Sequence, residues 1–149
     1  MEWKLNDQLC FLLYANSRNV IKLYKDLLDP LGLTYTQYIT MIALWEEDHQ
    51  MVSDLGQRLS LDSGTLTPLL KKLEHDGRIK RTRDSKDERK VWIDLTEQGR
   101  KLSDEAKHVP FELFKCVDLE IEDAMKLHEI LSKLNNKNKA CEKVDGQGE

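Results

Sequence analysis

A cysteine, Cys10, lies in the most apolar run of the N-terminal segment, within the stretch DQLCFLLY at residues 7–14. Such a cysteine is either a small hydrophobic residue of a core or a thiol kept for its reactivity. On a helix, Tyr14 lies about 40° to one side of Cys10 and Tyr24 about 40° to the other, so the three share one face. Tyr24 is roughly 21 Å away along that helix, so it cannot contact Cys10 within one chain.

Two copies of this helix would solve the problem of distance. If they run antiparallel about a twofold axis near residue 17, Cys10 of one subunit lies opposite Tyr24 of the other. Tyrosine hydroxyls would then donate hydrogen bonds to the thiolate and favour the ionised, reactive form, as would the nearby helix N-terminus. A peroxide would oxidise such a thiolate to a sulfenic acid, which a second thiol readily attacks.

The other two cysteines, Cys116 and Cys141, lie far from Cys10 in the sequence, and none of the four histidines sits beside a cysteine. Without a Cys-x-x-Cys pair, this spacing is not that of a metal site, and we expect neither metal nor cofactor. Residues 2–4 do not begin a signal-like segment, and no apolar run approaches the roughly 18 residues of a membrane span. We therefore expect a cytoplasmic protein with no membrane partner, whose thiols are normally reduced.

Positive charge is concentrated in one part of the chain. The 149 residues are 34% charged and 40% hydrophobic, a composition typical of a helix-rich single domain, and their net charge is −4. Residues 71–90 nevertheless contain nine Lys and Arg against five Asp and Glu. Because the distribution of charge matters more than its sum, this segment remains a candidate for binding nucleic acid.

The spacing of apolar residues predicts six helices and two strands. The first helix is capped by Asn6 or Asp7 and ends at Pro30, the second starts at Thr34 or Thr36, and Ser53 caps the third. Alternation predicts strands on either side of a polar tip at residues 84–90. The predicted helices are 7–29, 35–45, 53–59, 65–75, 97–119 with a bend at Pro110, and 121–134, followed by a polar tail.

A short helix, a tight turn, a second helix and a basic two-stranded ribbon form, in this order, a winged helix-turn-helix. The small hydroxyl residues Ser63, Thr65 and Thr67 at the start of the recognition helix can approach base edges and phosphates in the major groove. Lys71 and Lys72, about two turns later, suit phosphate contacts that position the helix.

At the predicted wing tip, Lys86, Arg89 and Lys90 can enter or flank the minor groove, where an arginine gains from the negative potential. Asp87, two residues before Arg89, could orient it. The helix and the ribbon together predict a DNA-binding surface.

Three stretches resemble the MarR family of dimeric transcription regulators: LDSGTLTPLLKKLE at 61–74, DER at 87–89 and LTEQG at 95–99. The N-terminal LCFLLY with LTY at 33–35 is similar, more narrowly, to the peroxide-sensing OhrR-like branch. The resemblance runs from about Asn6 to Leu134.

The resemblance implies a mainly α fold with a small β-hairpin wing, whose N- and C-terminal helices form a dimerisation region. The dimerisation helices would be residues 1–34 and 97–137, the winged DNA-binding lobe 35–96, and the polar tail 138–149. The homodimer would bind an inverted-repeat operator in double-stranded DNA and repress transcription until a signal arrives.

In the OhrR-like branch, the resemblance implies that Cys10 is the reactive thiolate and that Tyr24 and Tyr35 of the partner subunit form its hydrogen-bonding cage. The placement of Cys116 is similar to that in members that form a disulfide between subunits. A packing role for Cys116, and resolution by Cys141 or by a small thiol, stay open. The expected function is a repressor that releases its operator when peroxide or another oxidant oxidises Cys10.

Two other functions belong to different classes. A MarR relative released by a small phenolic or apolar ligand would need a pocket between the dimerisation and winged lobes, and its response would survive Cys10→Ser. A thiol peroxidase would need a Thr-x-x-Cys pocket or an arginine beside Cys10, but Arg18 lies about 80° around the helix. We therefore do not expect an enzyme.

Overall fold

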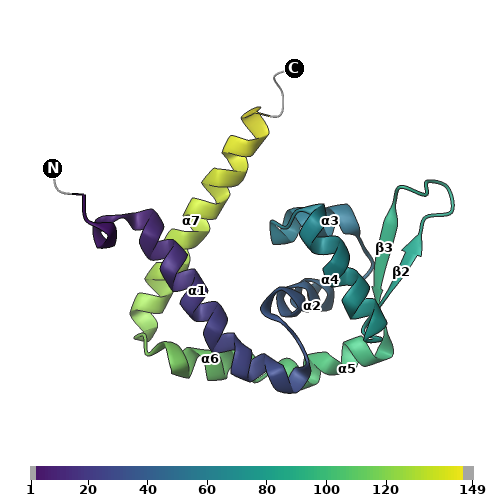
Figure 1. Cartoon of the computed structure of the whole chain (residues 1–149), viewed down its shortest axis with the longest axis horizontal. Coiled ribbons are helices and arrows are strands. Elements are labelled where there is room, and N and C mark those ends of the chain that lie inside the picture. Colours follow the sequence, from purple (N-terminus) through teal and green to yellow (C-terminus); the bar gives the residue numbers. More distant parts are fainter. Residues whose placement is uncertain (1–2, 146–149) are drawn as a thin grey trace. The chain divides into compact units, whose positions relative to one another are not determined.

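The computed structural model describes the backbone of residues 3–145 and the side chains of residues 3–136. Within this range the chain is mainly helical, with three short strands (Figure 1). The elements, in chain order, are η1 (Leu5–Asp7), α1 (Leu9–Leu28), η2 (Asp29–Leu31), α2 (Tyr35–Glu46), β1 (Gln50–Met51), α3 (Val52–Leu59), α4 (Ser63–His75), β2 (Ile79–Arg83), β3 (Val91–Leu95), α5 (Glu97–Ala106), α6 (Val109–Val117) and α7 (Ile121–Asp145).

The chain divides into two units, Met1–Leu113 and Phe114–Glu149. The first contains α1 to α5 and the sheet, and the second contains the end of α6 and α7. No helix in the described part of the chain is both long and apolar enough to cross a membrane.

The core of the first unit is built around α2, of whose twelve residues six are buried. Helices α3, α4 and α5 pack on it. Helix α4 buries leucines at the predicted helical spacing, whereas Ile79, Ile93 and Leu95 bury one face of the sheet. The buried leucines of α4 are Leu66, Leu69, Leu70 and Leu73. The predicted winged helix-turn-helix is therefore confirmed.

Hydrogen bonds from side chains satisfy both ends of α2. At its start, Thr34 and Gln37 form a reciprocal capping box, which confirms the prediction of Thr34 as the cap. At its end, the side chains of Gln50 and Arg58 both donate to the carbonyl oxygen of Ala43, at 2.9 and 3.2 Å. These bonds explain why the buried Gln50 is tolerated in the core.

Three predicted helix starts differ from the structure. Gln8, and neither Asn6 nor Asp7, precedes α1, because Leu5–Asp7 already forms a 3-10 turn. Ser53 does not cap α3: pairing of Met51 with the sheet starts that helix at Val52. Helix α4 begins at Ser63, since the Asp62 carboxylate accepts the backbone N–H of Thr65 at 2.9 Å.

The sheet contains one strand more than predicted. Its order is β1-β3-β2, antiparallel throughout, with Gln50 opposite Ile93 and Ile79 opposite Leu95. Strand β1 has two residues, too few to show an alternation of apolar and polar side chains.

The single bent helix predicted over 97–119 is wrong, because the chain forms two helices, α5 and α6, on either side of Lys107 and His108. Pro110 has no N–H to donate to the carbonyl oxygen of Ala106, so the helical ladder is interrupted there. Helix α7 continues past the predicted end at Leu134 to Asp145. The side chains of the predicted tail, 138–149, lie outside the described residues, with Cys141 among them.

The start of α5 is pressed against the turn before β2. The Thr96 hydroxyl caps α5 and also donates to the carbonyl oxygen of Gly77 at 2.6 Å, while the Thr96 backbone N–H donates to the carbonyl oxygen of Arg78 at 3.1 Å. Gly99 is buried in this contact, and a Cβ there would overlap the carbonyl oxygen of Arg78.

Replacing Gly99 by alanine should therefore lower the free energy of unfolding by about 1–3 kcal/mol, the usual cost of overpacking. Urea denaturation followed by circular dichroism measures this change. Gly64→Ala is the matched control, since a Cβ at that position meets only a carboxylate oxygen of Asp62. Equal stability of the two variants would contradict the close contact between α5 and Arg78.

Candidate functional site

The predicted contact residues of the recognition helix α4 all lie on its exposed side, opposite the buried leucines. Ser63, Thr67 and Lys71 are spaced by four residues and form one stripe. Thr65 and Lys72, two turns apart, lie along the other edge of the exposed side. The helix therefore offers hydroxyl groups at its start and cations farther along, as a helix in the major groove requires.

Two of these side chains already have partners. The Thr65 hydroxyl donates to the Asp62 carboxylate at 3.1 Å, and Lys72 donates to Asp76 at 2.8 Å. The bond from Lys72 holds the pKa of Asp76 below its usual value. Because an exposed ion pair of this kind is weak, a phosphate can compete with Asp76 for Lys72.

Helix α4 is fastened to the wing by a contact that the sequence analysis missed. The Glu74 carboxylate accepts from the Nε of Arg81 at 2.8 Å and from its backbone N–H at 3.0 Å. The side-chain hydrogen bond from Arg81 is the main reason that the pKa of Glu74 is lowered. Their separation of seven residues across a turn follows no local rule, although a carboxylate ending α4 before a basic strand was a possible signal.

The wing tip brings together the predicted cations Lys86, Arg89 and Lys90, all exposed. The predicted contact of Asp87 with Arg89 exists, but in a different form from an ion pair. The Asp87 carboxylate accepts the backbone N–H of Arg89 at 3.1 Å. Asp87 thus fixes the path of the chain at the tip rather than the guanidinium group.

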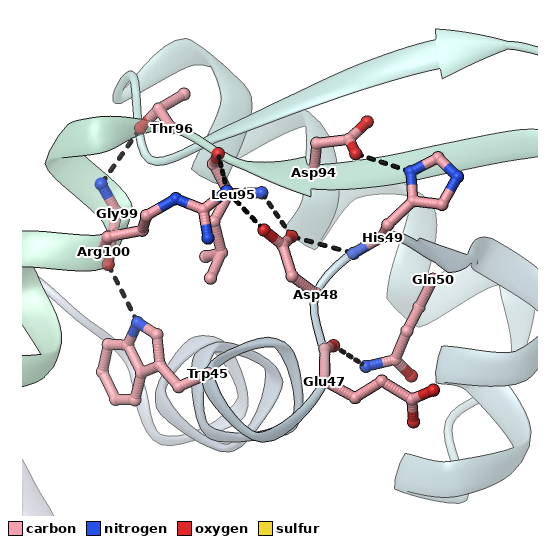
Figure 2. A network of polar contacts seen from close by, with 10 residues as sticks. All are labelled: Trp45, Glu47, Asp48, His49, Gln50, Asp94, Leu95, Thr96, Gly99 and Arg100. Atoms are coloured by element: carbon pink, nitrogen blue, oxygen red, sulfur yellow. Dashed lines mark hydrogen bonds and ion pairs between the residues drawn. The ribbon is translucent and has the colours of Figure 1, made fainter.

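Behind the wing, Asp48 joins the end of α2 to β3 and α5 (Figure 2). Its carboxylate accepts the backbone N–H groups of Leu95 and His49, each at 2.8 Å, and pairs with the guanidinium of Arg100 at 2.5 Å. Burial alone would raise the pKa of Asp48, but these three donors outweigh it and hold the pKa below its usual value. The sequence predicts only that a helix ends at residue 45, just before this segment.

His49 continues this network on the exposed face of the sheet. Its backbone is left-handed, with φ at 57°, and its Nδ1 lies 2.6 Å from a carboxylate oxygen of Asp94 (Figure 2). Its ring stacks on Trp92 with centroids 4.4 Å apart and planes 3° from parallel. A non-glycine residue with positive φ is strained, so these contacts must hold it in place.

Cys10 is exposed in the first turn of α1. It is therefore not a small hydrophobic residue in the core of a single chain. Tyr14, which was predicted to share its face, accepts a hydrogen bond from the Arg18 guanidinium at 2.6 Å. The same guanidinium lies 5.4 Å from the centre of the Tyr14 ring. Tyr14 therefore interacts with Arg18 of its own helix.

Tyr24 and Tyr35, the predicted cage residues, contact each other although they lie on different helices. Their ring centroids are 4.9 Å apart, with planes at 47°, and Tyr38 lies 5.7 Å from Tyr24. Burial, with a smaller effect of Tyr35 and Tyr38, raises the pKa of Tyr24 to about 12. At neutral pH the Tyr24 hydroxyl therefore keeps its proton and can donate it in a hydrogen bond.

Cys116 is exposed on α6 and belongs to the second unit, whereas Cys10 belongs to the first. The predicted pairing of these cysteines therefore stays a prediction. Among the residues with described side chains, no cluster of three or more His, Cys, Asp and Glu could hold a metal ion.

An open cleft of about 600 Å³ lies in the first unit between η2, Arg78 and the start of α5. Its lining includes Arg78, Glu97, Lys101 and Glu105. The guanidinium of Arg78 donates to the carbonyl oxygens of Gly32 and Leu31, at 3.0 and 2.6 Å.

Comparison with known proteins gives a consistent result. Residues 22–106 match the family model described as transcriptional regulator SarA/Rot. The organic hydroperoxide resistance transcriptional regulator of Bacillus subtilis is 52% identical over 107 residues, which cover 72% of this chain and 73% of that protein.

Solved structures of AbfR, a Staphylococcus epidermidis protein, are also similar. Reduced AbfR bound to DNA is 34% identical with a TM-score of 0.79, covering 92% of this chain and 94% of that one. Disulfide-formed AbfR is 33% identical with a TM-score of 0.60, covering 93% and 92%.

A structure of MarR, 20% identical with a TM-score of 0.76 and covering 89% of this chain and 98% of its own, has the same fold. The family model spans more than half of the chain, and the Bacillus subtilis relative exceeds half identity over most of it. These matches confirm the resemblance drawn from the sequence: the chain belongs to the MarR/SarA family of transcriptional regulators.

Proposed function

We propose that this protein is a redox-sensing repressor that binds an inverted-repeat operator as a homodimer and releases it when Cys10 is oxidised. One arrangement carries the proposal: Cys10 is exposed, and Tyr24 and Tyr35 contact each other away from it. Tyr24 lies too far along α1 for Cys10 of the same chain to contact it. The likeness to a regulator of organic hydroperoxide resistance and to AbfR supports it.

The DNA-binding part of the proposal rests on the exposed side of α4 and on the wing. Ser63, Thr65 and Thr67 would meet base edges and phosphates, while Lys71 and Lys72 would contact the backbone. Lys86 and Arg89 would reach the adjacent minor groove, with Asp87 holding the chain that carries them. The DNA-bound structure of AbfR supports this use of the fold.

The homodimer follows from apolar side chains that the single chain leaves in water. On α1, Leu9, Leu12, Tyr14, Ile21 and Leu23 are all exposed. Exposed apolar residues gathered on one helix indicate a protein interface. An antiparallel pairing of two α1 helices through the face that carries Cys10, Tyr14 and Ile21 would cover the apolar residues of that face. It would also bring Cys10 of one subunit to Tyr24 and Tyr35 of the other.

The chemistry at Cys10 is a two-electron oxidation. The thiolate sulfur attacks one oxygen of a hydroperoxide, so that an S–O bond forms, the O–O bond breaks, and the leaving alkoxide takes up a proton to become an alcohol. Attack by a second thiol on the resulting sulfenic acid forms a disulfide and releases water. We propose Cys116 of the partner subunit as that thiol, in line with disulfide-formed AbfR.

Formation of this disulfide would act on DNA binding through helix position. The two Cα atoms must approach within about 7 Å, which requires the helices that carry the cysteines to shift. A shift at the interface would turn the winged lobes and change the distance between the recognition helices. These must match half-sites roughly 34 Å apart, so the oxidised dimer would release its operator.

Replacing Arg89 by alanine should weaken binding roughly five- to 150-fold, because an arginine in the groove contributes on the order of 1–3 kcal/mol. A fluorescence-anisotropy titration measures this with a 30-base-pair duplex that the wild-type protein has selected from a randomised pool. Lys101→Ala is the matched control, since Lys101 lies on α5 and pairs with Glu97. Equal affinities of the two variants would remove the wing from the interface.

Replacing Tyr24 by phenylalanine should slow the oxidation of Cys10 at pH 7 about tenfold, because the thiolate loses a hydrogen bond worth on the order of 1.5 kcal/mol. Stopped-flow consumption of the thiol by cumene hydroperoxide measures the rate. The difference from wild type should shrink at high pH, where the thiol ionises without help. Tyr14→Phe should oxidise at the wild-type rate, and a slowing as large as that of Tyr24→Phe would argue against the cage.

Replacing Cys116 by serine should leave Cys10 oxidisable but abolish the covalent dimer that peroxide produces on non-reducing gels. Release of the selected duplex should then be weaker or should require an added small thiol. Cys141→Ser is the control and should behave as wild type. A covalent dimer in Cys116→Ser but not in Cys141→Ser would assign the resolving role to Cys141. Peroxide-driven release by Cys10→Ser would overturn redox sensing itself.

A further inference from the structure

The wing tip is a loop that burial does not hold in place. From Asp84 to Lys90 every side chain is exposed or only partly covered, and six of the seven residues are charged. A loop of this kind would sample many conformations unless hydrogen bonds fix it, and fixing it on DNA would cost conformational entropy. The order of the tip must therefore come from polar contacts.

Asp84 supplies most of these contacts. One oxygen of its carboxylate accepts the backbone N–H groups of Lys86 and Asp87, at 2.8 and 3.1 Å. The other accepts the indole N–H of Trp92 at 3.1 Å, and the Asp84 backbone N–H donates to the carbonyl oxygen of Lys90 at 2.9 Å. The Asp84 side chain thus holds the first arm of the loop and ties it to Trp92 of β3, while the Asp84 backbone binds the second arm at Lys90.

Trp92 is itself held in place by His49. Its ring stacks on His49, whose backbone N–H is bound by Asp48 and whose imidazole is bound by Asp94. Asp48 also pairs with Arg100 on α5 (Figure 2). A continuous series of contacts therefore runs from α5 through Asp48, His49, Trp92 and Asp84 to the wing tip.

Asp84 is a negatively charged residue in a loop that is proposed to bind DNA. A carboxylate among groove-binding cations repels phosphates, so its presence weakens binding unless it does something that outweighs this repulsion. The hydrogen bonds to Lys86, Trp92 and Asp87 hold the pKa of Asp84 below its usual value, so the group is charged at neutral pH. Glu88, in the same loop, is exposed and provides an acid without these contacts.

We propose that Asp84 and Trp92 are positioning residues of the wing, which fix the tip loop in the conformation that presents Lys86 and Arg89 to the minor groove. This inference rests on the proposed DNA contact of the wing. It makes a prediction opposite in sign to simple electrostatics, because removing the negative charge of Asp84 should weaken DNA binding instead of strengthening it.

The test compares Asp84→Ala with Glu88→Ala in the full-length chain, by anisotropy titration of the same selected 30-base-pair duplex at several salt concentrations. Asp84→Ala should bind about five- to thirtyfold more weakly, as expected for loss of a preorganised loop. Its plot of log K against log salt should become less steep, since each lost phosphate contact reduces the size of the slope by about 0.9. Glu88→Ala should bind as tightly as wild type or more tightly. Trp92→Phe, which keeps the ring but loses the donor, should lie between wild type and Asp84→Ala.

Tryptophan fluorescence separates positioning from a loss of folding. The emission of Trp92, obtained by subtracting the spectrum of Trp92→Phe, should shift in Asp84→Ala and stay unchanged in Glu88→Ala, while the melting temperature stays within a few degrees of wild type. If Asp84→Ala melts early, Asp84→Asn, which keeps one acceptor oxygen, replaces it. Binding of the Asp84 variant as tight as that of Glu88→Ala overturns the inference. If Arg89→Ala also binds like wild type, the proposed wing contact fails as well.

Discussion

The Asp48 carboxylate is the contact on which the arrangement of the winged lobe depends. It lies where the chain leaves α2 and binds, at once, the backbone of β3, the backbone of His49 and the guanidinium of Arg100 on α5. Since a partly buried carboxylate without donors would be costly, these three elements must stay together for the site to be stable. Strand β3 of the wing, the turn that follows α2 and helix α5 thereby share one anchor.

The two parts of the candidate DNA surface are held by different forces. The recognition helix is placed by burial, since four leucines fix one side of α4 in the core and leave the hydroxyl and lysine side chains outside. The wing tip has no such core and depends on Asp84 and Asp87, which bind backbone N–H groups. The Glu74–Arg81 pair connects the two parts, so that helix and wing form one surface.

The candidate thiol site combines Cys10 with its candidate hydrogen-bond donors in an arrangement that one chain does not complete. Cys10 is exposed at one end of α1, while Tyr24 near the other end contacts Tyr35 and keeps its proton at neutral pH. Tyr14 and Ile21, which are exposed on the Cys10 face of α1, would be covered by the same pairing that joins these groups. In the proposed dimer, sensing and assembly therefore depend on one interface, which explains how oxidation of a thiol could move the DNA-binding lobes.

The sequence by itself determined the elements whose causes are local. Apolar spacing located the helices and both hairpin strands, and Thr34 was one of two threonines predicted to start α2, since a cap acts on a residue three positions away. Even at Pro110, local chemistry indicated the interruption, although not that it produces two helices. Only the tertiary structure decided the pairing of β1 with β3, the Asp48 anchor, the Glu74–Arg81 pair and the contact of Tyr24 with Tyr35. These contacts join residues from seven positions apart, in the pair of Glu74 with Arg81, to 52 positions apart, in the pair of Asp48 with Arg100, so they depend on the path of the whole chain.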